Sequence, residues 1–437
     1  MNWRKVVQLT MVHVGVSVTV VPVTSTLNRV MIADMHFSAF LVGLLISLPY
    51  LLSPIQVAIG NWADSHPLWG RFRSPWILIG GLLASFGSYF TAHAAFLMNT
   101  DFVPGLMAAI VAFTAWGLGV NIASVSYLSL ISEISGENEG WRSRTISIMW
   151  TVMILSSILV SIMLSRSLTD FSQEALFTAF GAVWTLSTFL ILFGSANIEG
   201  PNHSVTNGAD VQSANPILAY RLLVENPSAR RFFFYLLLVL VSIHAQDVLL
   251  EPFGGQVLEM DVSQTSRLTA IWGIGVLVTL VSGIYVIRKL GKKSCANIGA
   301  ILAAIAFGFI IFSGLVKTIP FFQWSIFLLG LGGGLMTISN LSFMLEMTIP
   351  KAAGLYMGAW GVANFSGQAL GTIASGLIRD VTYQLSNNVT AGYVIVFGLE
   401  IVGLVGAVLL FRRITVTRFR EDSAMRLDQM LALLANP

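Results

Sequence analysis

The sequence predicts an all-α polytopic membrane protein, with twelve transmembrane helices in two six-helix pseudo-repeats. The mean hydropathy is +0.78 and only 10% of the 437 residues are charged, whereas roughly 25% are charged in soluble domains. A bilayer core about 30 Å thick needs roughly 20 apolar residues per helical span, and the chain contains twelve such stretches. The lipid bilayer is therefore the expected surroundings of most of the chain.

The first six expected spans form an N-terminal bundle over residues 1–196. The first continues without a small-residue cleavage site into "TSTLNRVM", so we interpret it as an uncleaved span rather than a signal peptide. The fourth is longer than a bilayer requires, which predicts a tilted or extended helix. The six spans are 6–27, 38–60, 75–97, 103–133, 142–164 and 175–196.

Residues 197–230 are expected to form a cytoplasmic linker. The stretch "NIEGPNHSVTNGADVQSANP" has no Lys, Arg or aromatic residue and is rich in Asn, Gly, Ser and Pro, a composition typical of flexible linkers. The following "ILAYRLLVE" is short and amphipathic and ends at Asn226-Pro227, which predicts an interfacial helix with a break after it.

The second six spans form a C-terminal bundle over residues 231–412. They are expected at 231–250, 266–288, 295–317, 320–345, 351–376 and 390–412. Residues 413–437 follow as an amphipathic cytoplasmic tail.

An internal repeat supports the division into two halves. "SYLSLISE" (126–133) lies near the end of the fourth span, and "SNLSFMLE" (339–346) lies near the end of the tenth. They share Ser, Leu, Ser and Glu in register at equivalent spans, as in transporters built from repeated halves around a central cavity. Glu133 and Glu346 are expected to be hydrated and paired, with Arg142 or Arg144 and with Lys351.

The distribution of basic residues predicts that both termini are cytoplasmic. With a cytoplasmic N-terminus, the cytoplasmic segments hold 19 Lys and Arg residues, as the positive-inside rule requires. Five lie on the opposite side: Arg29, Arg166, Arg267, Lys317 and Arg379.

Several classes of function are disfavoured by the sequence. Cys295 is the only cysteine, which excludes an internal disulfide and argues against a thiolate metal site. No phosphate-binding loop is present, and no nucleophile stands beside a base or ligand cluster with metal-site spacing. We therefore expect neither an enzyme nor an ATP-driven pump, and no nucleic-acid partner.

Charged or titratable residues at membrane depth are the candidate functional residues, because each needs a polar partner, a water-filled cavity or a functional role to offset the cost of its burial. Glu400 lies near the middle of the last span, where it is either protonated and bonded to a neighbouring helix or in contact with a ligand. Asn28 and Arg29 close the first span, with Asp34 as a counter-charge, and act by snorkelling or as a gate. His13, His93 and His244 are each a packing residue, a proton relay or a ligand for the magnesium of a chlorin.

A polar insert stands out near the middle of the chain, in "AQDVLLEPFGGQVLEMDVSQTSRLTAIWG" (245–273). Asp247 and Glu251 are one helical turn apart, next to Gln246, and Pro252 with two glycines is expected to break the helix after them. Like charges at this spacing repel unless a cation, a proton or a donor lies between them. Glu259, Asp261 and Arg267 are expected to be solvated in the loop beyond.

The loop "GNWADSHPLWGRFRSP" (60–75) resembles the Gly-x-x-x-Asp-Arg-x-Gly-Arg-Arg loop of the major facilitator superfamily. In that superfamily an Asp at a helix end pairs with Arg to latch the cytoplasmic side. The candidate latch residues are Gly60, Asp64, Arg71 and Arg73; Ser65 stands where Arg is usual, and "HPLW" is inserted. The alternative is that the two arginines only fix the topology.

Together, several stretches resemble the PucC family, the bacteriochlorophyll-delivery branch of that superfamily. They run in order from the first span to the eleventh: "TSTLNRVMIADM", "SPIQVAIGNWADSHPLWGRFRSPWILIG", "VSYLSLISEI", "RTISIMW", "QDVLLEPFGGQVLEMDVSQTSRLTAIWG" and "GLYMGAWGVANFSGQALGTIASGLIRD". The motif positions carried over are Asn28, Arg29, Asp64, Arg71, Arg73, Gln246, Asp247, Glu251, Pro252, Gly254, Gly255, Arg379 and Asp380.

The resemblance implies an assembly factor for light-harvesting antenna complexes in a photosynthetic membrane, cytoplasmic or thylakoid. It implies (bacterio)chlorophyll as cargo or bound ligand and antenna polypeptides or photosystem and reaction-centre proteins as partners. The protein holds no metal of its own in this interpretation, and His244 is the candidate ligand for chlorin magnesium. Two alternatives stay open: a proton-coupled secondary transporter of a small apolar solute, and a scaffold for antenna assembly that binds no pigment.

Overall fold

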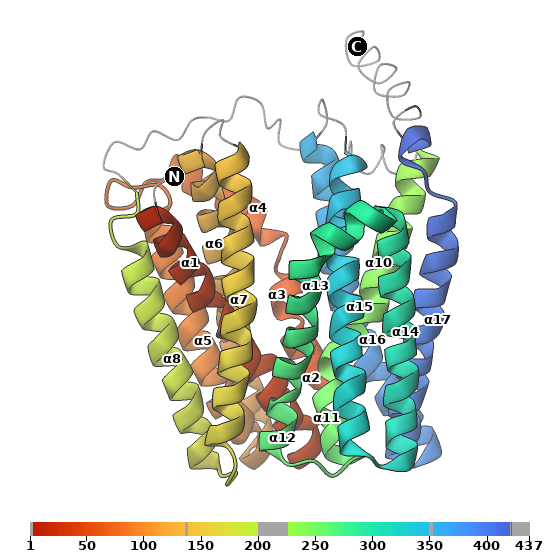
Figure 1. Ribbon diagram of the computed structural model, residues 1–437. Helices are drawn as coiled ribbons and strands as arrows, with labels where there is room; N and C mark the ends of the chain where they lie inside the picture. The colour runs from red at the N-terminus through yellow and green to blue at the C-terminus, as the bar shows by residue number, and fades with distance from the viewer. Residues whose placement is uncertain (1–2, 136–138, 200–225, 349–352, 420, 422–437) are drawn as a thin grey trace, which may run out of the picture.

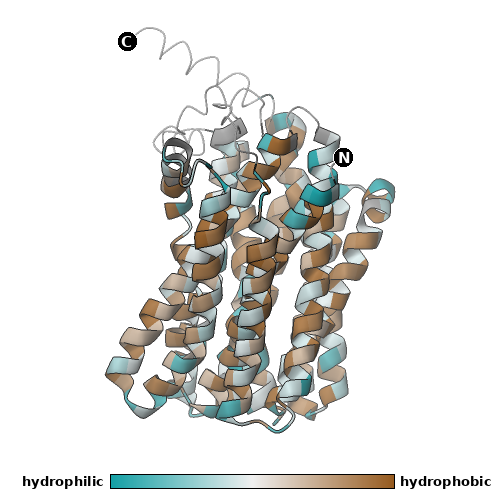
Figure 2. Ribbon diagram, turned by 90° about the vertical axis from the view of Figure 1, so that its left-hand side faces the viewer, coloured by the Kyte–Doolittle hydropathy of each residue, from teal (hydrophilic) through white to brown (hydrophobic). Residues whose placement is uncertain are grey.

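The computed structural model describes residues 3–135, 139–199, 226–348, 353–419 and 421. These residues are helical apart from turns, short loops and one isolated bridge between Leu68 and Arg71. The helices form two bundles that stand side by side (Figure 1). Hydrophobic residues dominate the middle of the helices and hydrophilic ones gather toward the two ends (Figure 2).

The first half contains six spans, two of which are interrupted. The first is α1 (Trp3–Ser17) followed by two π-helical segments, η1 (Pro22–Leu27) and η2 (Val30–Asp34). The second consists of α2 (Ala39–Ile46), α3 (Leu48–Leu51) and α4 (Ile55–Ser65). The other four are α5 (Ser74–Thr100), α6 (Phe102–Ser135), α7 (Glu139–Ser167) and α8 (Gln173–Ser195).

The second half begins at Asn226, whose side chain accepts hydrogen bonds from the first two free backbone N–H groups of α10 (Pro227–His244). The chain continues through η3 (Ala245–Val248), α11 (Leu250–Gln256) and the short α12 (Val262–Ser266). Five long helices complete the half: α13 (Leu268–Leu290), α14 (Lys292–Val316), α15 (Ile319–Glu346), α16 (Ala353–Ser386) and α17 (Val389–Arg412). The interfacial helix expected within 217–225 and most of the expected tail lie outside the described residues.

Ten helical segments of the described chain are long and apolar enough to cross a membrane. The expected spans 38–60 and 351–376 are not among them. The first corresponds to α2–α4, which Pro49 and Pro54 break into pieces too short to count because proline removes a backbone donor. The second corresponds to α16, a continuous helix of 34 residues whose polar side chains, such as Asn364 and Gln368, lower its hydropathy.

Two further boundaries differ from the sequence-based expectation. The first span continues past Asn28 and Arg29 to Asp34 instead of ending near residue 27. In the seventh span the break lies at η3 and not at Pro252, which occupies the first turn of α11. Proline is favoured in a first turn, where its missing N–H would have no partner. The seventh span therefore extends to Gln256.

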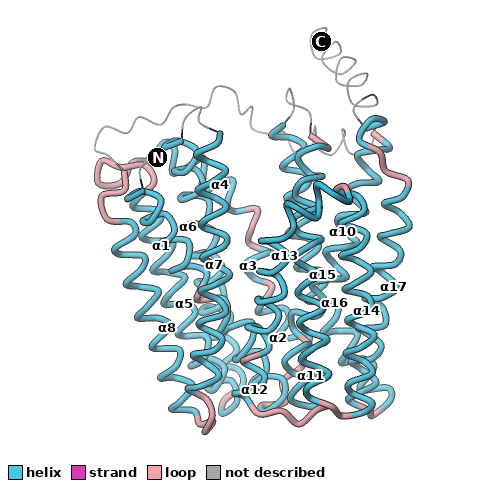
Figure 3. Tube along the Cα trace, viewed as in Figure 1, coloured by secondary structure: helices cyan, strands magenta, loops and turns pink. Residues whose placement is uncertain are grey.

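The start of α1 and the end of α17 lie at the same end of the molecule (Figure 3), which we call the termini end. Among the described residues, hydrogen bonds between the halves gather toward the opposite end, where they form the inter-half seam. Gln256 Nε2 donates to Ile32 O at 3.0 Å, Ser161 Oγ donates to Ser266 O at 2.5 Å, and Asp380 accepts from Ser38 and Phe40. The halves are thus fastened to each other at the opposite end.

The internal repeat makes equivalent contacts in both halves. Glu133 at the end of α6 pairs with Arg73, just before α5, and Glu346 at the end of α15 pairs with Lys292 at the start of α14. The second repeat position also behaves alike: Tyr127 bonds to His13 of the first span, and Asn340 accepts from Tyr235 of the seventh. The sequence predicted Arg142 or Arg144 as the partner of Glu133 and Lys351 as the partner of Glu346, whereas the structure shows Arg73 and Lys292 in these pairs. Lys351 lies outside the described residues.

Candidate functional site

A cavity of about 180 Å³ lies between the two halves, on the termini side of the seam. Helix breaks from both halves meet there, and such breaks are tolerated at membrane depth where the freed backbone groups find partners or line a cavity. The first half contributes Val20, Thr24, Ile46 and Tyr50, and the second half contributes Gln246, Asp247, Leu250, Glu251, Leu268, Thr269, Trp272 and Thr372.

The break in the seventh span places the polar insert at this cavity. The tight turns of η3 leave the carbonyls of Asp247 and Val248 to be capped from the other half, where Asn28 Nδ2 donates to them at 3.3 and 3.2 Å. Gln246, Asp247 and Glu251 all line the cavity as a result. The structure thus brings these three residues together at one cavity, and the helix breaks before Glu251 rather than after it.

His244 and Asp247 form a pair beside the cavity. His244 Nδ1 lies 2.8 Å from Asp247 Oδ2. A carboxylate can only accept, so Nδ1 carries the hydrogen and Nε2 of a neutral ring keeps its lone pair. Histidines that ligate metals are usually oriented in this way by a second group. His244 is about one-quarter exposed, so the pair is suited to donate a nitrogen ligand or to accept a proton.

Glu251 and Asp247 accept hydrogen bonds from different donors. The Glu251 carboxyl is buried and accepts from Thr269 Oγ1 at 3.2 Å. The expected repulsion between the two acids is thus reduced by two different partners, an imidazole and a hydroxyl. This hydrogen bond also links Glu251 to α13, which lines the same cavity.

Several buried acceptors in this region have no donor among the described residues. Both carboxyl oxygens of Glu400, Oε1 of Gln246 and Oδ1 of Asn28 lack hydrogen-bond partners. Glu400 is 2% exposed and does not line the cavity. A buried ionised carboxylate without a cation is costly, and a proton would remove that charge. The expected hydrogen bond from Glu400 to a neighbouring helix is absent among the described residues.

Three other predicted site residues lie away from the cavity lining. Asn28 and Arg29 belong to the seam, where Arg29 pairs with Asp34, as expected, and donates to Met260 O at 3.0 Å. His13 is 5% exposed inside the first half, and its Nδ1 lies 2.8 Å from Tyr127 Oη. The structure therefore assigns these residues contacts within the protein.

Two of the four candidate latch residues, Arg71 and Arg73, have described side chains and lie in the loop at the termini end. Arg73 is buried and pairs with Glu133 through Nε and Nη2, at 2.7 and 2.6 Å. Arg71 donates to Asn197 at 3.0 Å. Gly60 and Asp64 lie in α4, and the side chain of Asp64 is outside the described residues. Both arginine contacts stay within the first half.

The uncharged residues that line the cavity were not predicted from the sequence. Tyr50 of α3, Thr269 and Trp272 of α13 and Thr372 of α16 come from three separate elements, and Nε1 of Trp272 has no acceptor among the described residues. Polar residues without charge are common in membrane helices, so no single-residue signal marked them. They are recognised as site residues only because the structure places them around one cavity.

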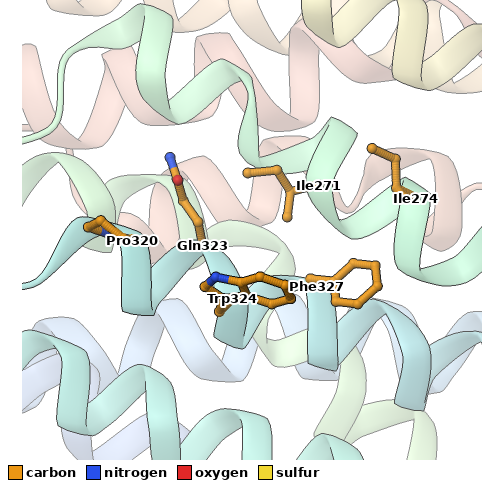
Figure 4. Close-up of a pocket in the computed structure, with 6 residues that line it drawn as sticks. All are labelled: Ile271, Ile274, Pro320, Gln323, Trp324 and Phe327. Carbon is orange, nitrogen blue, oxygen red and sulfur yellow. The ribbon is translucent and has the colours of Figure 1, made fainter.

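A second hollow lies on the other side of α13, between α13 and α15. Its volume is about 340 Å³, and Figure 4 shows Ile271, Ile274, Pro320, Gln323, Trp324 and Phe327 around it. Trp324 is 70% exposed near the start of α15, as expected of a tryptophan at a membrane interface. Gln323 is the only lining residue with a polar side chain that is not aromatic, so this hollow carries little chemistry.

The chain matches the family model described as "PUCC protein" over residues 26–419. It is 27% identical to "Protein PucC" of Rhodovulum sulfidophilum, with 86% of this chain and 85% of that protein covered. It is 28% identical to an "Uncharacterized protein in puhA-bchM intergenic region" of Rhodobacter capsulatus, with 89% and 82% covered. It is also 23% identical to the "Bacteriochlorophyll synthase 44.5 kDa chain" of Rhodobacter capsulatus, with 96% and 97% covered.

Solved transporters share the fold. The nucleoside transporter NupG has a TM-score of 0.68 at 16% identity, with 94% of this chain and 99% of that chain covered. A bacterial homologue of the human lysosomal transporter Spinster, in an inward-facing and unoccupied conformation, has a TM-score of 0.72 at 14% identity, with 97% and 98% covered. These similarities establish the major facilitator superfamily fold.

Proposed function

The chain belongs to the PUCC protein family, and from that premise we propose that it is a membrane-embedded assembly factor for photosynthetic antenna complexes. In this proposal it binds a chlorophyll-type pigment and delivers it to antenna polypeptides. The names of its relatives support a pigment-related role, since one is named as a chain of bacteriochlorophyll synthase. Its partners would be antenna or reaction-centre polypeptides in a photosynthetic membrane.

The observation that carries the proposal is the His244–Asp247 pair at the inter-half cavity. A bound chlorin would supply a magnesium ion with a free axial position. His244 offers a nitrogen whose lone pair is available, Asp247 holds the ring in that tautomer, and Trp272 offers an N–H without a partner among the described residues. These side chains fit the polar anchors that such a ligand needs.

The size of the cavity sets a condition on this proposal. About 180 Å³ is below the roughly 300–1,000 Å³ of pockets that enclose drug-sized ligands. A whole chlorin therefore does not fit between the halves in the present arrangement. Binding there requires the halves to move apart. The polar side chains of the cavity suit a chlorin, whereas the volume of the cavity in this arrangement is too small for one.

The test is the pigment content of the protein purified gently from its native membrane. We expect roughly stoichiometric chlorophyll-type pigment and co-purifying antenna polypeptides, with less pigment in His244→Leu at equal expression. His66→Gln, which changes an exposed histidine at the termini end, is the matched control. No pigment in the wild-type protein would overturn the proposal, and antenna polypeptides without pigment would identify a scaffold instead.

A proton-coupled transporter of a small apolar solute is the second candidate function. It is favoured by Asp247 and Glu251, two carboxyl groups that line the cavity of a transporter fold. In proteoliposomes this candidate predicts uptake that responds to a pH gradient and is abolished in Asp247→Asn or Glu251→Gln. Uptake that ignores the gradient would reject it.

A further inference from the structure

We propose that the outer surface of the first half carries a separate pigment site, a groove between α5 and α6 in which His93 is the axial ligand of a chlorin-class metallated tetrapyrrole. The inference rests on the proposed pigment-binding function but names a different site. His93 does not line the inter-half cavity. The first half alone forms this groove.

The groove is shaped by small residues on its floor and large residues on its rim. Its volume is about 530 Å³. Ala94 and Ala112 are almost fully buried on the floor, whereas Phe90 and Val111 on the rim are 51% and 67% exposed. The lining residues are Leu83, Phe86, Gly87, Phe90, His93, Ala94, Leu97, Met107, Ala108, Val111, Ala112 and Ala115.

His93 is the only titratable side chain in that lining, and its ring is held in place on two sides. Its Nδ1 lies 3.3 Å from the backbone oxygen of Tyr89, one turn earlier. Its ring stacks on Phe177 of α8, with 4.0 Å between centroids and 11° between planes. Since a carbonyl oxygen only accepts, Nδ1 carries the hydrogen and the lone pair is on Nε2.

Nε2 of His93 makes no hydrogen bond among the described residues and is not buried. His93 lies about 28 Å along α5 from Ser74, at 1.5 Å per residue, and so within the membrane-crossing part of the helix. An unpaired nitrogen facing hydrocarbon is unfavourable. A ligand that brings a metal ion with an open axial position would satisfy it.

The rest of the groove suits a large, flat and apolar ligand. Its volume lies within the roughly 300–1,000 Å³ typical of small-molecule sites and is about three times that of the inter-half cavity. Phe86 and Phe90 offer aromatic faces to a ring system. The hollow between α13 and α15 in Figure 4 lacks an imidazole, so it offers no comparable metal ligand.

The position of the groove suggests how such a site would serve delivery. The groove is lined by residues of α5 and α6 and has the exposed Phe90 and Val111 on its rim; these two helices belong to the bundle that does not contain α13–α17 (Figure 1). A pigment held there would meet a neighbouring transmembrane helix directly. Exchange at this site would not require the two halves to separate.

The test compares pigment binding by the full-length protein and three variants. His93→Leu removes the ligand, and Ala108→Trp fills the groove while keeping His93. Leu159→Trp, at a 67% exposed position of α7 outside the groove, is the matched control. Pigment per chain is measured after gentle purification, and detergent-solubilised protein is titrated with bacteriochlorophyll a and, separately, with haem b, while absorption and the Raman markers of metal coordination are followed.

We expect His93→Leu and Ala108→Trp each to weaken bacteriochlorophyll binding at this site at least tenfold, and Leu159→Trp to behave as wild type. Unchanged pigment content and coordination markers in His93→Leu, with only a lower Tm, would mean that His93 merely packs α5 on α8 and would overturn the inference. Binding of haem b alone would overturn the chlorin assignment. If the wild-type protein binds no pigment, the proposed function itself fails, whereas pigment retained in full by His93→Leu rejects only this site.

Discussion

Glu199 illustrates how one carboxylate from a distant segment can fix the start of a helix. Its oxygens accept from the backbone N–H groups of Phe72, Arg73 and Ser74, at 2.8 to 3.0 Å. These groups precede or begin α5, where no helical partner exists and the helix dipole favours an anion. Burial alone would raise the pKa of the Glu199 carboxyl, but the hydrogen bonds from Ser74, Phe72 and Arg73 together hold it below its usual range.

Glu199→Gln is expected to lower the stability of the first half at neutral pH, because charge-assisted hydrogen bonds are lost, by about 1–3 kcal/mol. A lowered pKa in the folded state means that the carboxylate stabilises the protein above its unfolded pKa near 4.5 and that this contribution disappears as the pH falls through the folded value. Thermal unfolding in detergent between pH 7 and pH 3 measures both effects. A wild-type advantage that persists undiminished at pH 3 would contradict the prediction.

The histidines show that residue type alone does not define a site. His13, His93 and His244 shared the same three possible roles in the sequence, with His244 favoured as the chlorin ligand, and each has a different environment in the structure. His13 bonds to a buried tyrosine, His244 to a carboxylate beside a cavity, and His93 to its own helix beside a groove. The environment, which depends on residues far away in the sequence, decides which nitrogen is available.

Among the helices, glycine determines how closely the two halves approach each other. α2 and α16 cross at the inter-half seam, where a Cβ added at Gly376 would lie 2.4 Å from the backbone oxygen of Ala39. Backbone cannot yield as a flexible side chain can. The contact therefore requires glycine, as in other close helix crossings in membranes.

Gly376→Ala is expected to destabilise the protein, and Gly358→Ala in the same helix provides the matched control. Both substitutions improve helix propensity by up to about 1 kcal/mol, and a Cβ at Gly358 meets nothing within 4 Å. We expect Tm in detergent to fall by several degrees for Gly376→Ala and to stay or rise for Gly358→Ala. Equal Tm values for the two variants would show that α2 and α16 are not in close contact.

The breaks in the second and seventh spans are stabilised by side chains that hydrogen-bond to the freed backbone carbonyls. Asn121 Nδ2 of α6 donates to Pro49 O at 2.9 Å in the second span, and Asn28 does the same for η3 in the seventh. Buried backbone carbonyls freed by a break need a donor. The sequence showed the prolines of the second span and marked Asn28 as a motif residue, but it did not show that Asn28 and Asn121 cap the breaks.

For the whole molecule, the inter-half seam defines the present conformation. Asp380 at the end of α16 accepts from Ser38 Oγ at 2.7 Å and from Phe40 N at 2.9 Å, so one half caps the first turn of α2 in the other. Arg379 holds that carboxylate at 2.8 Å and donates to Gln256 at 2.6 Å. A polar network therefore links the last long helices to the first spans.

Asp380→Ala is expected to loosen the seam, because two groups of the first half lose their acceptor. In a Cys295→Ala background with Ile32→Cys, a position that is 1% exposed at the seam, maleimide labelling should become several times faster. Asp101→Ala, which removes a charge at the same end after α5, should leave the rate unchanged. An Asp380→Ala rate equal to that of the parent would show that the seam does not depend on this carboxylate.

The sequence by itself determined the membrane class, the family, the two-half fold and the polar cluster Gln246, Asp247 and Glu251. Hydropathy and local motifs are properties of short segments, so they can be recognised without knowing what packs against them. Only the tertiary structure decided that Glu133 pairs with Arg73, that Asn28 caps η3, and that His93 faces a groove while His13 does not. These outcomes depend on contacts between residues 60 or more positions apart or on different helices, which packing selects and no local pattern specifies.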